Sequence, residues 1–157
     1  MRFIPRLAQA QLVLAMIALM VMGAVTVADV FLKYAFNRPI VGAYDLVESL
    51  LPVVIFHGLP ATLLRRQNIT IDLIDGFAGP RNTAILIRLA DLIILILLVL
   101  MVWAMTYAAN QAFEYGDRKL ELGLSLAVVW AFALTGMAGA ILAGIYVLFE
   151  RRKEAAT

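Results

Sequence analysis

Four long apolar segments constrain this chain more than any other feature of its sequence. The clearest lies within residues 82–109 and contains LIILILLVLMVW; the others are residues 11–34, 45–64 and 122–149. A helix needs about 20 apolar residues to cross the hydrocarbon core of a membrane. Of the 157 residues, 64% are hydrophobic and 15% are charged, whereas soluble domains are about 45–50% apolar and about 25% charged. The sequence therefore predicts an all-α integral membrane protein, a single domain of four transmembrane helices, and excludes a disordered chain or a cytosolic enzyme.

The first apolar segment also has features of a secretory signal peptide. Arg2 and Arg6 precede it, and residues 26–28 resemble a small-residue cleavage site. The apolar part of a signal peptide is only about 7–15 residues long, and this run is longer. We therefore expect it to be retained as the first membrane span.

A polar connection, RRQNITIDLIDGFAGPRN, separates the second and third segments. Its apolar residues Ile71, Ile74 and Phe77 recur at helical spacing. The two aspartates, Asp72 and Asp75, fall on the opposite side of the predicted helix. This pattern is typical of a short amphipathic helix that lies in the membrane interface. The helix is expected to end at Gly76, Gly79 and Pro80.

The positive charges predict the orientation of the spans. Nine of the 13 Lys and Arg residues fall at the two ends of the chain and in the middle connection, and four fall in or beside the two other connections. Loops rich in Lys and Arg stay in the cytoplasm, so both termini are predicted to be cytoplasmic. The formal net charge of only +2 does not suggest nucleic acid as a partner.

Several kinds of chemistry are excluded by residues that the sequence lacks. There is no cysteine and a single histidine, His57. Disulfides, thiolate metal sites, iron–sulfur clusters and haem ligation by paired histidines are therefore excluded. The sequence also contains no nucleophile–base set and no phosphate-binding glycine loop, so it predicts neither an enzyme nor a bound cofactor.

Ionisable residues inside the spans are candidates for function, because charge is costly at membrane depth. Asp29 lies four residues before Lys33 and is expected to form a local ion pair. Asp91 follows Arg88 by about one turn, and pairing with it or snorkelling is favoured over an ion pathway. His57 lies in mid-span, where a hydrogen bond to a neighbouring helix is favoured over a proton relay.

Two further features concern the helix ends and helix packing. Asp45 and Glu48 open the second span, where a carboxylate favourably meets the positive end of the helix dipole. In the fourth span, Gly136, Ala140 and Gly144 recur every four residues. A ridge of such small residues lets another helix approach closely, either within this chain or from a partner.

An ordered set of residues from Lys33 to Ile74 resembles the small permease subunit of tripartite ATP-independent periplasmic (TRAP) transporters, the DctQ-like family. The family pattern combines a basic-aromatic end of the first helix, an Asn/Arg-X-Pro turn, an acidic start of the second helix, a mid-helix glycine, an Arg-Arg exit and a segment that ends in Asp. In this chain the corresponding residues are Lys33, Tyr34, Asn37, Arg38, Pro39, Asp45, Gly58, Arg65, Arg66, Asn68 and Asp72.

The resemblance implies a non-catalytic scaffold subunit in the bacterial inner membrane. It would brace a large permease subunit for sodium-coupled uptake of an organic anion that a periplasmic binding protein delivers. The implied partners are those two proteins and membrane lipids. Three alternatives remain open from the residues alone: a small membrane subunit of another complex, a four-helix membrane enzyme and a small exporter.

Overall fold

The computed structural model describes residues 3–65 and 75–154, and side chains are described for residues 3–65 and 85–150. Within these ranges the chain forms four α-helices and no β-strand. They are α1 (Phe3–Phe36), α2 (Ala43–Leu64), α3 (Asp75–Glu114) and α4 (Leu126–Glu154). Each contains a stretch long and apolar enough to cross a membrane. The prediction of an all-α membrane protein with four membrane-spanning helices is confirmed.

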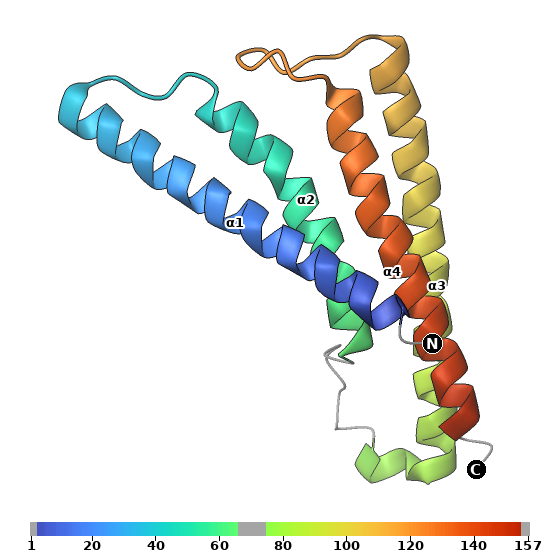
Figure 1. Cartoon of the computed structure of the whole chain (residues 1–157). Coiled ribbons are helices and arrows are strands. Elements are labelled where there is room, and N and C mark those ends of the chain that lie inside the picture. The colour runs from blue at the N-terminus through green and yellow to red at the C-terminus, as the bar shows by residue number, and fades with distance from the viewer. Residues whose placement is uncertain (1–2, 66–74, 155–157) are drawn as a thin grey trace.

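The four helices form two hairpins that cross and then diverge (Figure 1). One hairpin is α1 with α2, and the other is α3 with α4. The central pair is α2 and α4, because α2 packs on both α1 and α4, while α4 also packs on α3. The connections α1–α2 and α3–α4 lie together at one end of the molecule, and the chain termini lie toward the other end (Figure 1). We call the end that carries the two connections the loop end.

The turn from α1 to α2 is set by two residues with positive φ. Asn37, at φ 53°, ends α1, and its N–H donates to the carbonyl of Lys33 at 3.0 Å. Gly42, at φ 83°, precedes the first residue of α2. A side chain is disfavoured in this left-handed region, which explains glycine at position 42 and the tolerated asparagine at 37.

Two expectations about helix boundaries were wrong. Gly76, Gly79 and Pro80 lie inside α3 and do not end a helix. A proline in a helix removes one hydrogen bond and bends the axis, and the first part of α3 runs across the base of the molecule before the helix turns toward the loop end (Figure 1). The rest of the expected interfacial helix, including Ile71 and Ile74, lies outside the described residues.

The fourth helix begins at Leu126, four residues later than expected. The preceding residues fold into a tight turn in which Arg118 and Ser125 form an antiparallel bridge. The Lys119 N–H donates to the carbonyl of Leu124 at 2.9 Å, and Gly123 takes φ 64°. Leucines in this turn extended the apolar run in sequence, although the positive φ at Gly123 is incompatible with helix.

Small side chains occupy the helix interfaces, and large apolar side chains point outward. Ala133, Met137, Ala140 and Ala143 of α4 are completely buried. The buried residues of α1 are all alanines, whereas most of the large apolar side chains of α3 are exposed. This distribution is the one expected where lipid surrounds the protein and small residues let the helices approach.

Candidate functional site

The connections at the loop end are joined by a hydrogen-bonded cluster centred on Asp45, which we call the loop clasp. The Asp45 carboxylate accepts hydrogen bonds from the backbone N–H groups of Glu121, at 2.8 Å, and Leu122, at 3.1 Å. In return, the Glu121 carboxylate accepts the N–H of Gly42 at 2.8 Å. The Asp45 carboxylate, in the first turn of α2, therefore satisfies two backbone donors of the α3–α4 connection, and the Glu121 carboxylate of that connection satisfies one backbone donor of the α1–α2 connection.

Burial strengthens the Asp45 side of the clasp. Asp45 is only 7% exposed, and hydrogen bonds to a charged group are worth about 1.5–3 kcal/mol each. The Ser49 hydroxyl donates to the backbone carbonyl of Asp45 at 2.6 Å, so the first turn of α2 is fixed as well. Asp45 was interpreted from sequence as a partner of the helix dipole. Its position in the first turn fits that interpretation, and its bonds to the other connection add a second role.

An ion pair closes the clasp on its outer side. Lys119 Nζ lies 2.5 Å from Glu48 Oε2, and the two side chains are 13% and 49% exposed. Because the Glu48 side of the pair is half-exposed, water screens it, and solvent-exposed pairs contribute about 0–1 kcal/mol, less than the Asp45 bonds. Sequence reasoning assigned Glu48 to the helix dipole alone and missed Lys119 and Glu121. The sequence feature that could have indicated the clasp is the presence of oppositely charged residues near the two turns, Glu48 in α2 and Lys119 in the α3–α4 connection, with a further acid at Glu121.

A second fixed point lies deeper, where α2 crosses α4. A Cβ added at Gly136 would lie 2.7 Å from the backbone carbon of Phe56 and 2.9 Å from the nitrogen of His57. The backbones of the two helices are therefore in direct contact. Ala140 is completely buried, and at Gly144 an added Cβ would meet Leu95 of α3 at an ordinary 3.4 Å. The ridge thus faces α2 at one end and α3 at the other, within this chain.

Hydrogen bonds made by side chains of α1, α2 and α4 surround this crossing. His57, only 2% exposed, places Nε2 3.2 Å from the Thr135 hydroxyl of α4 and Nδ1 3.1 Å from the Val53 carbonyl. The Gln11 carboxamide of α1 donates to the Thr135 carbonyl at 2.9 Å. His57 therefore has the interhelical hydrogen bond that was favoured from sequence. Gln11 and Thr135 were missed, because amide and hydroxyl side chains carry no charge to mark them.

Asp29 does not form the expected ion pair with Lys33 among the described residues. Its carboxylate instead accepts the N–H of Ile40 at 2.6 Å and ties the end of the α1–α2 connection back to α1. That N–H lies two residues before Gly42, where no helical carbonyl can satisfy it. Asp91 is half-buried on α3.

The other sequence-predicted residues are dispersed. Arg38 and Pro39 are exposed in the α1–α2 connection, and a side chain at Gly58 would meet nothing within 4 Å. Arg65 is exposed, and its N–H caps α2 by bonding to the Ala61 carbonyl at 3.0 Å. Arg66, Asn68 and Asp72 lie outside the described residues.

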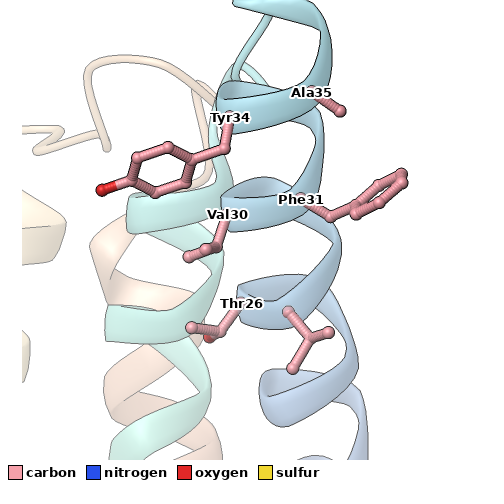
Figure 2. Close-up of a pocket in the computed structure, with 6 residues that line it drawn as sticks. Thr26, Val30, Phe31, Tyr34 and Ala35 are labelled. Atoms are coloured by element: carbon pink, nitrogen blue, oxygen red, sulfur yellow. The ribbon is translucent and has the colours of Figure 1, made fainter.

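Two hollows formed by described residues are apolar. One is a 640 Å³ depression along α1 alone, lined by Thr26, Val27, Val30, Phe31, Tyr34 and Ala35. Figure 2 shows Tyr34 and Phe31 extending to different sides of the helix. The other is a 340 Å³ groove between α1, α2 and α4. Neither is lined by a charged side chain, and the described residues contain no group of acidic or histidine residues that could hold a metal ion.

Comparisons with known proteins extend this description. A search of curated proteins gives no match. The family model for the DctQ component of tripartite ATP-independent periplasmic transporters matches residues 22–154. The match includes the last part of α1, residues 22–36, and all of α2, α3 and α4, and so contains both the loop clasp and the α2–α4 crossing. The chain therefore belongs to the DctQ family, the DctQ components of tripartite ATP-independent periplasmic transporters.

Proposed function

We propose that this chain is the small, non-catalytic scaffold subunit of a TRAP-type secondary transporter. It braces a large permease subunit, which takes up an organic anion coupled to sodium, and a periplasmic binding protein delivers that anion. The observation that carries the proposal is the double fixing of α2 against α4. The backbones touch at Gly136 deep in the bundle, and the loop clasp joins the same two hairpins at the loop end.

The chemistry of the surface supports a role away from the substrate. An organic anion needs cations or several hydrogen-bond donors, and the two hollows offer neither. In the groove, the Ser49 hydroxyl is already bonded to the Asp45 carbonyl. In the α1 depression, the Thr26 hydroxyl is bonded to the Met22 carbonyl. The apolar character of these two hollows supports our proposal that the large subunit holds the substrate and sodium sites.

We propose that the loop end is periplasmic and that both termini are cytoplasmic in the bacterial inner membrane. The distribution of Lys and Arg supports this orientation, and the even number of spans agrees with it. Reporter fusions after Ala43 and after Asp117 should read periplasmic. Fusions after Gly79 and after Thr157 should read cytoplasmic, and a periplasmic signal from the C-terminal fusion would contradict the orientation.

The middle connection is proposed to hold the bundle at a fixed depth. Its cations would bind anionic lipid head groups, at about 1 kcal/mol per cation, while Ile71 and Ile74 enter the acyl boundary. Spin labels at these two positions should contact lipid, and a label at Thr70 should contact water. Equal water exposure at all three positions would remove the interfacial helix.

A rigid brace keeps its shape while its partner moves, and this property tests the scaffold role. The chain has no cysteine, so spin labels can be introduced as cysteine pairs without background. Val27 of α1 and Leu97 of α3 are 70% and 53% exposed and lie on different hairpins. Their distance, measured by pulsed electron resonance in the assembled transporter, should not change when sodium and the loaded binding protein are added. A shift in that distance would show that the hairpins move and would refute the static role.

A further inference from the structure

The groove between α1, α2 and α4 is a consequence of how the two hairpins are fixed. Helices α2 and α4 touch at Phe56 and Gly136 and diverge toward the loop end (Figure 1). The groove begins one turn away from that contact, at Val53 and Phe132, and reaches Leu124 next to the loop clasp. It is closed at one end by the crossing and bounded at the other by the loop clasp, so contacts within this chain define both of its ends.

We propose that this groove binds one acyl chain of a membrane phospholipid. All lining residues except Leu124, which lies in the turn before α4, come from three membrane-spanning helices. The single hydroxyl of the lining, on Ser49, already donates a hydrogen bond within α2. No group in the groove therefore requires a polar ligand. A groove left empty would forfeit the dispersion contacts of its lining. The medium that bathes these helices supplies hydrocarbon chains to restore them.

The dimensions of the groove favour a single chain over a helix of a partner protein. Along α1 it extends from Leu14 to Val21, which is about 10 Å at a rise of 1.5 Å per residue. A partner helix would run across the full hydrocarbon core, about 30 Å thick, and would need a contact of comparable length. One acyl chain occupies only one leaflet, about half that thickness. The 340 Å³ volume lies near the lower end of small-molecule pockets, which are about 300–1,000 Å³.

Photolabelling from lipid tests the proposal on the full-length chain. The protein is reconstituted into phosphatidylethanolamine–phosphatidylglycerol vesicles that contain a phospholipid with a diazirine in its acyl chain. After irradiation, lipid adducts are mapped by mass spectrometry. Residues 46–53 of α2 should carry severalfold more adduct than the face of α3 around Leu97 and Leu100. These leucines are more than 50% exposed, whereas Ser49 and Val53 are less than 10% exposed. Labelling that simply follows exposure would overturn the proposal.

A matched pair of variants links the labelling to the groove itself. Val21 lines the groove and is 42% exposed, so Val21→Trp fills the groove from its open side. Val27, six residues further along α1, lies outside the groove. Val21→Trp should reduce adducts on residues 46–53 severalfold, and Val27→Trp should leave them unchanged. Equal labelling in both variants would contradict the assignment.

The same labelling in the assembled complex distinguishes a lipid from a protein occupant. A bound acyl chain predicts that adducts on residues 46–53 persist when the co-purified partner is present. Their loss on assembly would show that a segment of the partner fills the groove and would overturn the lipid assignment. Neither result depends on whether the partner is a permease, so failure here is distinguishable from failure of the scaffold role.

Discussion

The close contact of Gly136 with α2 makes Gly136→Ala the sharpest test of the packing described here. The new Cβ would lie 2.7 and 2.8 Å from the carbonyl carbon and oxygen of Phe56, and 2.9 Å from the nitrogen of His57. All three are backbone atoms of a helix, so none can rotate away. One methyl group would therefore push α2 and α4 apart along their whole contact.

The expected magnitude follows from two opposing effects. Overpacking a close-packed interior costs about 1–3 kcal/mol. Alanine is favoured over glycine within a helix by about 0.5–1 kcal/mol. Because the obstructing atoms are all backbone atoms, we take the upper part of the overpacking range, about 2–3 kcal/mol, and expect a net destabilisation of about 1–2 kcal/mol for Gly136→Ala. By the scaling of soluble domains of this length, that lowers the melting temperature by about 2–8 °C.

Two other glycines provide matched controls for the same chemical change. At Gly144 the added Cβ would lie 3.4 Å from a terminal methyl group of Leu95, an ordinary contact with the flexible end of a side chain. At Gly58 it would meet nothing within 4 Å. Both alanine variants should be as stable as the parent or slightly more stable.

The assay is thermal unfolding of the detergent-solubilised protein, followed by intrinsic fluorescence. Trp130 packs against the cluster that contains Met137 and Ala140, so its emission reports on α4. If Gly136→Ala melts at the same temperature as Gly144→Ala and Gly58→Ala, the backbones of α2 and α4 are not in close contact at Gly136.

Three further outcomes are expected. Asp45→Ala leaves the N–H groups of Glu121 and Leu122 without their carboxylate and should destabilise the protein by at least about 1.5–3 kcal/mol, the contribution of one hydrogen bond to a charged group. Hydrogen exchange at those two amides should be faster, and unchanged exchange would contradict the clasp. Glu48→Gln removes the half-exposed ion pair with Lys119 and should lower the stability by at most about 1 kcal/mol, and by less at high salt. A larger loss of stability in thermal unfolding would show that this ion pair, and not Asp45, contributes most to the clasp. Gln11→Leu should cost about 0.6 kcal/mol, the average for hydrogen bonds between membrane helices, and at most about 1.7 kcal/mol. A melting temperature equal to that of the parent would show that this bond contributes nothing.

The number of helices and their approximate places could be predicted because they depend on composition. A run of about 20 apolar residues is unfavourable in water whichever residues it contacts in the fold. Each membrane span is therefore visible from its own segment of the sequence. Boundaries were less certain where apolar residues continue beyond the helix. The start of α4 was placed too early because Leu122 and Leu124 belong to the turn before it, and the left-handed φ of Gly123 is visible only in the structure.

The partners of the polar residues could not be predicted. Asp45 was recognised, but its acceptor role for Glu121 and Leu122 depends on two connections that are far apart in sequence and meet only in the folded hairpins. The hydrogen bond between Gln11 and Thr135 could not be predicted for the same reason, because these residues are also far apart in sequence. The small-residue spacing around Gly136 predicted that a helix could approach, because the absence of side chains is a local property. It could not say that the approaching helix is α2.

The proposed scaffold role requires that the chain bind a large permease subunit in the membrane. The direct measurement is affinity purification of the tagged full-length chain from its native membrane in mild detergent, with identification of the bound proteins by mass spectrometry. We expect a large multi-span permease to co-purify in a fixed ratio with this chain, and Gly136→Leu to lower its recovery while Gly58→Ala does not. If the chain purifies alone and transports or catalyses by itself, the proposed scaffold role is wrong.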